Sequence, residues 1–184
     1  EEEGEAAFYG PKLDIQIKNV HGKEDTLITV QIDFQLAEKF GMQYVDSDGQ
    51  KRYPYVIHRT SIGCYERTLA LLIEKYAGAF PTWLAPVQVK ILPLVDKHHE
   101  YALELKKTFE EKGMRVEVDL RNEKIGYKIR EAQLEKVPYM VVIGDKEMEN
   151  KAVAVRSRKD GDLGSMQVED FLNRVLLEIA QKSR

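Results

Sequence analysis

The residue best suited to chemistry near the middle of the chain is an arginine among small side chains. Arg67 follows Gly63 and precedes Ala70, so a helix would bring all three to one face. A planar guanidinium on an open helix flank can stack on a purine ring or bind a phosphate. The structural alternative is an ion pair with Glu66 or Glu74. The small neighbours favour a ligand-binding role.

A turn near the start of the chain carries two more candidates, Tyr9 and Lys12. Gly10 and Pro11 bend the chain between them, just before a segment of alternating polar and apolar residues. Both side chains would therefore lie at the end of a sheet, where substrates are often bound. An ordinary surface turn with an exposed lysine is the alternative.

Polar residues within apolar strands form a third group. Gln31 and Asp33 lie on one face of an otherwise apolar segment, where each needs a hydrogen-bond partner. His58 ends another apolar segment, with no second metal-binding residue type beside it. Because zinc takes three or four ligands, spacing alone predicts a structural histidine there. The other histidines are expected at the surface: His21, His98 and His99.

Basic residues gather around a predicted helix in the second half. Arg121, Lys124 and Lys128 are spaced to share a face of this helix, and Arg130 lies near them. Asn122 precedes the helix and could cap it. A solvated basic face is the structural alternative.

Two further polar groups follow predicted strands. Gly144–Glu147 comes after a buried strand, at the edge where α/β sheets bind ligands. Arg156, Arg158 and Lys159 end the next strand. Together with the basic helix, these residues could form an edge that holds splayed single-stranded bases.

In the first half of the chain, the sequence predicts that an antiparallel sheet backed by a helix positions the candidate residues. Leu13, Ile15 and Ile17 alternate with polar residues, and a turn cluster separates that strand from the next, which predicts a hairpin. An apolar stripe of helical period ends at Gly78. The expected elements are strands at 12–18, 27–34, 43–45 and 53–57 and a helix at 61–77.

The second half alternates strands with amphipathic helices, which predicts a mixed-sheet α/β domain with parallel pairs. The fold class is therefore α/β, with an antiparallel core remnant first. A proline-rich stretch containing Trp83 is expected to be a linker at 80–87, between domains 1–79 and 88–184. The expected elements are strands at 89–95, 115–120, 139–143 and 152–156 and helices at 100–112, 123–136 and 168–179.

Composition narrows the class of protein. The 184 residues carry a net charge of −3, and the charge of neither half is positive enough to indicate nucleic-acid binding by itself. No apolar run approaches the ~20 residues that span a bilayer, so no membrane partner is expected. One cysteine, Cys64, fits a reducing compartment, and we expect a cytoplasmic location. The chain starts without Met, which suggests a piece of a longer protein.

Three motifs together carry a family resemblance. His58-Arg59, Gly63 and Glu66-Arg67 resemble motif three of a class II aminoacyl-tRNA synthetase. With FPTWLAPVQV at 80–89 and DLRNEKIGYKIRE at 119–131, essentially the whole chain resembles the carboxy-terminal part of bacterial threonyl-tRNA synthetases. These motifs are long and specific.

The resemblance implies roles for the first group of candidates. Tyr9 would face threonine, and Lys12 would stabilise charge developing at the α-phosphate. Gln31 would line the threonine pocket, and Arg67 would stack near the adenine of ATP and touch its γ-phosphate. His58 matches the last of three zinc ligands. The segment Asp25–Ile28 departs from the tryptophan–glutamine pattern common in the family.

The resemblance also implies an anticodon-binding domain. Asn122, Glu147 and Arg156 fall at positions that contact anticodon bases, with Arg121, Lys124 and Arg130 near the loop. Glu147 would accept hydrogen bonds from a base. The implied partners of the full-length parent are tRNA(Thr), threonine and ATP with magnesium, and the parent would be a zinc-containing homodimer.

Motifs one and two and two of the zinc ligands are missing from this sequence. We therefore predict that the chain alone does not aminoacylate tRNA and binds zinc weakly or not at all. A stand-alone RNA-binding module is the alternative function. A two-domain metabolic α/β protein is a third, which leaves the joint presence of both motif blocks unexplained.

Overall fold

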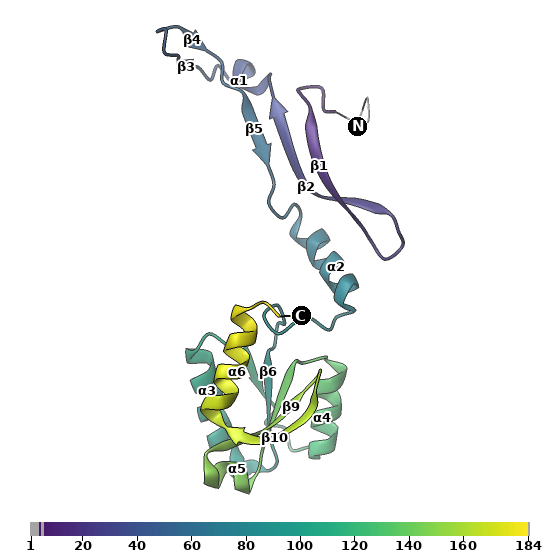
Figure 1. The fold of residues 1–184 in the computed structure, drawn as a ribbon, viewed down its shortest axis with the longest axis vertical. Helices are drawn as coiled ribbons and strands as arrows, with labels where there is room; N and C mark the ends of the chain where they lie inside the picture. The colour runs from purple at the N-terminus through teal and green to yellow at the C-terminus, as the bar shows by residue number, and fades with distance from the viewer. Residues whose placement is uncertain (1–3, 5, 184) are drawn as a thin grey trace. The chain divides into compact units, whose positions relative to one another are not determined.

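The computed structural model describes residue 4 and residues 6–183. The chain divides into two compact units, residues 1–75 and 76–184 (Figure 1). Among the described residues, no helix has the length and apolar character needed to cross a bilayer.

A three-stranded antiparallel sheet forms the first unit. Strands β1 (Lys12–Lys18), β2 (Glu24–Asp33) and β5 (Val56–Arg59) are hydrogen-bonded in the order β1-β2-β5. The predicted hairpin is confirmed, and its turn is closed by Asn19, whose Oδ1 accepts the N–H groups of His21 and Lys23. Strand β5 starts three residues later than predicted, because the chain before it holds Pro54 and pairs with no strand.

The two faces of this sheet differ in character. Residues directly opposite one another in an antiparallel pair point to the same side. The register therefore places mostly polar side chains on one face, with Val56 among them, and mostly apolar ones on the other, with Arg59 among them. The apolar face is open: Leu13 is 65% exposed and Ile57 is 67% exposed. The strand predicted to be half-buried therefore presents Leu13 and Ile15 to solvent within this chain, whereas Ile17 is half-buried.

Shorter elements complete the first unit. Helix α1 (Leu36–Lys39) follows β2, and the predicted third strand, β3 (Tyr44–Val45), pairs only with β4 (Lys51–Arg52) across a tight turn. Helix α2 (Tyr65–Tyr76) matches the predicted apolar stripe but buries none of its residues. It ends as predicted, with Gly78 at a φ of 76°.

Two glycines allow close backbone contacts that position the candidates. A Cβ at Gly10 would lie 1.9 Å from the carbonyl oxygen of Ile32. Gly63 has a φ of 75°, and a Cβ there would lie 2.5 Å from the carbonyl oxygen of Leu27. A side chain is excluded at both positions, so Gly10 seats the Tyr9–Lys12 turn on β2 and Gly63 sets the start of α2.

A mixed sheet forms the second unit, as predicted, and it has five strands. Strand β6 pairs in parallel with β7 and β8, whereas β9 runs antiparallel to β8. The edge strand β10 was not predicted. The order is β10-β9-β8-β6-β7, with β6 (Val89–Pro93), β7 (Val116–Val118), β8 (Tyr139–Ile143), β9 (Ala152–Ser157) and β10 (Gly161–Gln167).

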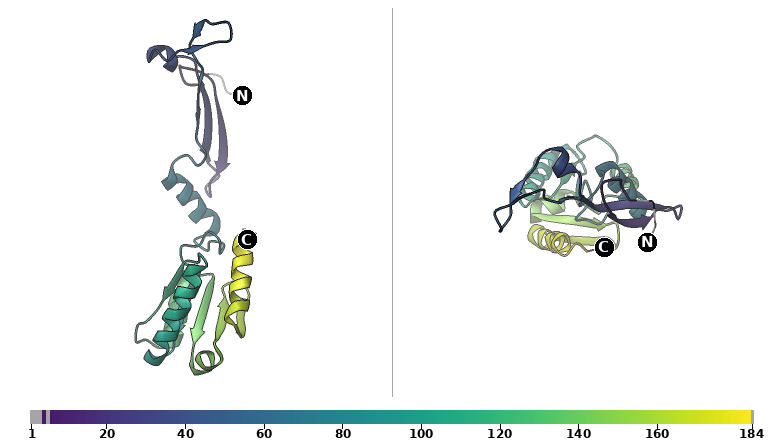
Figure 2. Two further views of the ribbon diagram at one scale, coloured as in Figure 1. Left: turned by 90° about the vertical axis from the view of Figure 1, so that its left-hand side faces the viewer. Right: turned by 90° about the horizontal axis from the view of Figure 1, so that it is seen from above.

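Helices cover both faces of this sheet (Figures 1 and 2). Helices α3 (His99–Glu111) and α6 (Val168–Ala180) pack on one face, where Phe109 and Phe171 join the main core. Helix α4 (Ile125–Leu134) covers the other face around Leu92 and Met140. The 3-10 helix η1 (Asp96–His98) and helix α5 (Asp145–Asn150) follow β6 and β8.

The stretch predicted as a linker is fastened to the second unit. We call residues 76–87 the strap. Six of its main-chain carbonyls accept hydrogen bonds from side chains of the second unit, and Thr82 and Ala85 are each 3% exposed. Lys136 donates to the carbonyl of Ala77, Arg158 to those of Ala79 and Phe80, Gln88 to that of Thr82, and Arg115 to those of Trp83 and Ala85.

Candidate substrate and RNA-binding sites

Three predicted site residues lie in one row across the sheet of the first unit. Gln31 on β2 is directly opposite Lys12 on β1 and directly opposite His58 on β5. Opposite residues share a face, so an amide lies between an ammonium and an imidazole on the polar side of the sheet. Tyr9 joins them, because its hydroxyl donates to Gln31 Oε1 at 3.0 Å.

Two carboxylates fix the ends of this row. Asp14 lies 2.8 Å from Lys12 Nζ and also accepts from Thr29 Oγ1 at 2.7 Å. These contacts, first with Lys12 and then with Thr29, lower the pKa of Asp14. Asp33 Oδ2 lies 3.1 Å from His58 Nε2. The row is thus a preorganised set of an ammonium, an amide and an imidazole rather than a set of loose side chains.

The pKa of Asp33 results from opposing effects. Burial alone would raise it, but hydrogen bonds from the N–H groups of Leu36 and Gln35, together with His58, lower it. Its Oδ1 accepts both N–H groups at 2.9 Å at the start of α1. The carboxylate that faces His58 is therefore held in place from two directions.

Arg67 lies farther along the same sheet. Its Nη1 donates to the carbonyl of Thr26 at 3.2 Å, and among the described residues it forms no ion pair with Glu66 or Glu74. Thr26 and Gln31 are five residues apart on β2, roughly 16 Å along the strand at about 3.3 Å per residue. A ligand that met both Arg67 and the Gln31 row would have to be extended.

The described residues do not fit a zinc ion. Nowhere in residue 4 or residues 6–183 do three or more His, Cys, Asp or Glu side chains converge on a metal position. His58 has Asp33 beside it and no third ligand, whereas zinc requires three or four. Cys64 is exposed and donates to Glu66 Oε2 at 2.9 Å, so it is a surface thiol.

Several candidates of the second unit gather where the parallel strands end. Because β7, β6 and β8 run in the same direction, the segments after them meet at one edge of the sheet. Arg121, Asn122 and Lys124 follow β7, and Glu147 lies on α5 after β8. We call this the carboxyl edge.

Two of these side chains are bound within the protein. Arg121 donates through Nη2 to Asp119 Oδ2 at 2.6 Å and through Nε to Oδ1 at 2.9 Å, and it also pairs with Glu131. Its contact with Asp119 raises the pKa of Arg121 and lowers that of Asp119. Glu147 Oε2 accepts the N–H of Gly144 at 3.0 Å, so one carboxylate oxygen caps α5.

The other predicted RNA-binding side chains are available. Within the part of the chain that the structure describes, no hydrogen bond or ion pair involves the side chains of Asn122, Lys124, Arg130 or Arg156. The first three are exposed and Arg156 is half-buried. Arg156 lies on β9 opposite Met140, close to the end of the sheet away from the carboxyl edge.

Four expectations about this region were wrong. Lys128 is 2% exposed and turned inward, not on a solvated basic face. Asn122 is not the cap, because α4 begins at Ile125 and Lys124 occupies the N-cap position. His98 is 3% exposed and bonded to Asp145 at 2.7 Å. Arg158 and Lys159 lie at the opposite edge, because β9 runs antiparallel to β8.

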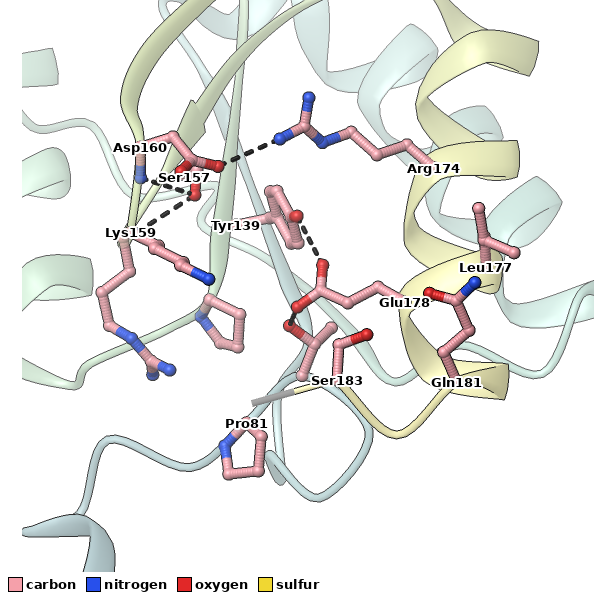
Figure 3. A pocket seen from close by; sticks show the side chains of 13 residues that line it. Pro81, Tyr139, Ser157, Lys159, Asp160, Arg174, Leu177, Glu178, Gln181 and Ser183 are labelled. Carbon is pink, nitrogen blue, oxygen red and sulfur yellow. Dashed lines mark hydrogen bonds and ion pairs between the residues drawn. The ribbon is translucent and has the colours of Figure 1, made fainter.

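A cavity of about 270 Å³ lies at that opposite edge (Figure 3). Glu178 projects into it and accepts from the hydroxyls of Tyr139 and Thr82, each at 2.6 Å. Burial, followed by the Glu178 contact, raises the pKa of Tyr139 to about 12. Arg174 pairs with Asp160 at 3.0 Å. Glu178, Arg174 and Asp160 thus each have a partner within the lining of the cavity.

Comparison with known proteins decides the family. The model "tRNA synthetase class II core domain (G, H, P, S and T)" matches residues 2–76, and "Anticodon binding domain" matches residues 88–178. The threonine–tRNA ligase of Clostridium perfringens (strain SM101 / Type A) is 67% identical over 99% of this chain. The chain belongs to the threonyl-tRNA synthetase family. The ligase of Acetivibrio thermocellus is similar at 62% identity over 98% of the chain.

A solved structure agrees with this membership. The crystal structure of the RNA binding domain of threonyl-tRNA synthetase from Cryptosporidium parvum Iowa II has a TM-score of 0.84 and 34% identity, covering 95% of this chain and 44% of that one. The predicted mixed α/β fold is confirmed. The chain spans 28% of the length of the C. perfringens threonyl-tRNA synthetase.

Sequence reasoning missed several residues that organise the carboxyl edge. Asp119, Lys128 and Glu131 hold the segment that carries Arg121 and Asn122. A partial signal existed, because Asp119 and Arg121 flank a strand end at a spacing that suits an ion pair. Nothing local distinguishes Lys128 from a surface lysine.

Proposed function

We propose that this chain is the part of a threonine–tRNA ligase that completes the aminoacyl-adenylate site and reads the tRNA anticodon. The parent enzyme would join threonine and ATP, with magnesium, into threonyl-adenylate and pyrophosphate. It would then transfer the threonyl group to tRNA(Thr). The observation that carries this proposal is the row Lys12–Gln31–His58, with Tyr9 bonded to Gln31.

In this proposal the row handles the amino acid. Gln31, oriented by the Tyr9 hydroxyl, would bind polar groups of threonine. Lys12 would face the reacting carboxylate and phosphate, where a fixed cation stabilises the charge that develops. Asp14 Oδ2 lies 2.8 Å from the Lys12 ammonium and holds this cation in position.

Arg67 would handle the nucleotide. Its guanidinium is exposed on α2 and fixed by the Thr26 carbonyl. The span between Arg67 and Gln31 suits an extended molecule, as an amino acid joined to a nucleotide would be. The assignment of His58 as a zinc ligand requires partners outside this sequence, and no step is assigned to the metal here.

The second unit would bind the anticodon loop. Asn122, Lys124, Arg130 and Arg156 offer unengaged polar and cationic side chains to RNA. Arg121 and Glu147 are fixed at the carboxyl edge, whereas Arg156 lies toward the other end of the sheet. Donors and acceptors of this kind can read the edges of unstacked bases. A homodimeric parent and a cytoplasmic location are part of the same proposal.

A stand-alone RNA-binding module is the second candidate. It is favoured by one observation: the second unit has a closed core, whereas α2 of the first unit buries no residue. Threonylation by this polypeptide would exclude the module. We expect none from the chain alone, and detectable threonylation would overturn that expectation.

The test is binding of the chain to an anticodon stem-loop of tRNA(Thr), beside a stem-loop with altered anticodon bases. We expect a preference for the first that Asn122→Ala and Arg156→Ala each reduce by about tenfold, the effect of losing roughly 1–3 kcal/mol of base contact. Lys107→Ala on α3 is the matched control. If binding is the same for both loop sequences and is lost at moderate salt, the chain only binds RNA phosphates non-specifically, and the proposed function is wrong.

A further inference from the structure

Lys128 is a lysine buried inside the second unit. It projects from α4 into the sheet and is only 2% exposed. Its Nζ donates to the carbonyl of Pro93 at 3.1 Å and to the carbonyl of Asp119 at 2.9 Å. Burying an ammonium is costly unless it is hydrogen-bonded, so this position calls for an explanation beyond core packing.

The two acceptors identify what Lys128 joins. Pro93 is the last residue of β6, and Asp119 is the first residue after β7. These strands are parallel neighbours, and their ends form part of the carboxyl edge. One side chain therefore ties together the two chain segments that leave the sheet there. Main-chain carbonyls, rather than carboxylates, receive the charge, so the contact fixes backbone positions.

Asp119 connects Lys128 to the exposed residues Arg121 and Asn122. Its carboxylate binds Arg121 through both oxygens and also accepts the main-chain N–H of Arg121 at 3.1 Å. The positive charges of Arg121 and, to a lesser degree, Lys128 help to lower the pKa of Asp119. Asn122 follows directly in the chain, so its backbone is set by the residue that Lys128 and Asp119 hold.

Helix α4 makes a second side-chain contact with the same loop. Glu131, one turn after Lys128, pairs with Arg121. The N–H of Lys128 itself reaches back to the carbonyl of Lys124 at 3.2 Å, where the loop enters the helix. Side chains of one helix thereby hold the loop 119–124 at its start and middle, and the loop ends at the N-cap of the same helix.

We propose that Lys128 is a positioning residue for RNA recognition, which presents Asn122 and Lys124 in fixed geometry. This inference rests on the proposed anticodon-binding function. Lysine suits the role because its ammonium has three donors and no acceptor, so it can bridge two carbonyls in a dry site. Lys128 itself would touch no RNA.

The experiment compares Lys128→Met with Lys107→Met in the full chain. Methionine keeps the volume and removes the donors, and Lys107 is an exposed lysine of the helix α3. Three quantities are measured at a temperature where both variants are folded: affinity for the tRNA(Thr) anticodon stem-loop, affinity for the loop-altered control, and amide exchange of Arg121.

For Lys128→Met we expect about a tenfold loss of preference between the two stem-loops, faster exchange of the Arg121 amide, and an unchanged salt dependence of binding. The salt dependence stays because the exposed cations remain. A merely structural lysine would lower the melting temperature and leave the preference intact, and that result overturns the inference.

The outcomes separate the two proposals. No preference in the unaltered chain overturns the proposed function, and this inference with it. A preference in the unaltered chain that Lys128→Met retains overturns the inference alone. If Lys128→Met does not fold, Lys128→Arg replaces it. Its guanidinium keeps the charge but moves the donors, so the same loss of preference is expected, and an unchanged preference counts against the inference.

Discussion

Asp33 Oδ2 lies 3.1 Å from Nε2 of His58, across the central ladder of the first unit. The same carboxylate receives two main-chain N–H groups at the start of α1. The imidazole is therefore oriented by an anion that is itself immobilised. Carboxylates that support histidines in this way commonly set which ring nitrogen faces a ligand. Here the arrangement leaves Nδ1 of His58 as the atom available to a partner.

Asp33→Ala should loosen this arrangement. The carboxylate side chain is 5% exposed and accepts three hydrogen bonds, so its removal leaves N–H donors without partners. We expect α1 and β5 to exchange their amide hydrogens at least several-fold faster, as measured by hydrogen exchange with mass spectrometry. Asp48→Ala, in the exposed β3–β4 turn, is the control and should affect that turn alone. Equal exchange in Asp33→Ala and the parent chain would contradict the account.

The ion pair between Asp119 and Arg121 should make the second unit acid-sensitive. A carboxyl whose folded pKa is lowered stabilises the fold above its unfolded pKa of about 3.9, and that contribution is lost as pH falls through the lower folded value. Asp119→Asn should therefore cost about 1–3 kcal/mol at pH 7 and less at pH 2, because protonation of the carboxyl removes its charge. Urea unfolding at both pH values tests this, with the exposed Glu149→Gln as control. A cost that is the same at pH 2 would rule out the ionic origin.

Tyr139 should produce the opposite dependence at alkaline pH. Its folded pKa of about 12 lies above the ordinary value of 10. The contribution of a group with a raised pKa is complete below the unfolded pKa and is lost as pH rises toward the folded value. Tyr139→Phe should remove one late-titrating phenol from the absorbance titration at 295 nm and reduce the fall in stability between pH 10 and 12. Tyr65→Phe, at a 78% exposed position, is the control and should leave the late-titrating phenol of Tyr139 in place.

Gly63 tests how α2 is placed. Gly63→Ala introduces a Cβ 2.5 Å from the Leu27 carbonyl as well as a strained φ, so the start of α2 must move. Gly22→Ala is the matched control, because Gly22 has a φ of 78° with nothing within 4 Å of its Cβ position. We expect amide protection in α2 to fall in Gly63→Ala and to be retained in Gly22→Ala. Similar protection in both would mean that the close approach does not matter.

The open apolar face of the first unit should make the chain self-associate. Leu13 and Ile57 are mostly exposed, and contiguous exposed apolar surface promotes association. Sedimentation velocity should therefore show a sedimentation coefficient that rises with concentration. The double substitution Leu13→Lys, Ile57→Lys should suppress that rise, whereas Gln16→Lys on the polar face should not. A concentration-independent monomer in the parent chain would refute this expectation.

Sequence periodicity recovered the elements with strong local patterns. The alternation in β1 and the apolar run of β8 specified strands because side-chain direction follows directly from the repeat. Helices α3 and α6 were found for the same reason. Strand β10 carries two glycines and a register shift after Asp162, so it shows no alternation and was missed. Helix α5 is six residues long and too polar to form a stripe.

The candidate site was predictable in part. Residue types identified the Tyr9–Lys12 turn and Gln31, because polar groups inside apolar segments stand out. The direction of β9 was not predictable, since a strand and its reverse have the same pattern, and this placed Arg158 at the wrong edge. The burial of Lys128 depends on two carbonyls that lie 35 and 9 residues away in sequence. Such long-range acceptors leave no local trace.

The strap decides how the second unit could be exchanged between proteins. A chimaera joined at residue 88 would discard six acceptors and leave the donors of Arg115, Arg158 and Lys136 facing water. It would also break the Thr82 contact with Glu178. A junction at residue 76 would transfer the unit intact. The piece of chain that must be transferred together therefore begins at residue 76, before residue 88, where the match to other anticodon-binding domains begins.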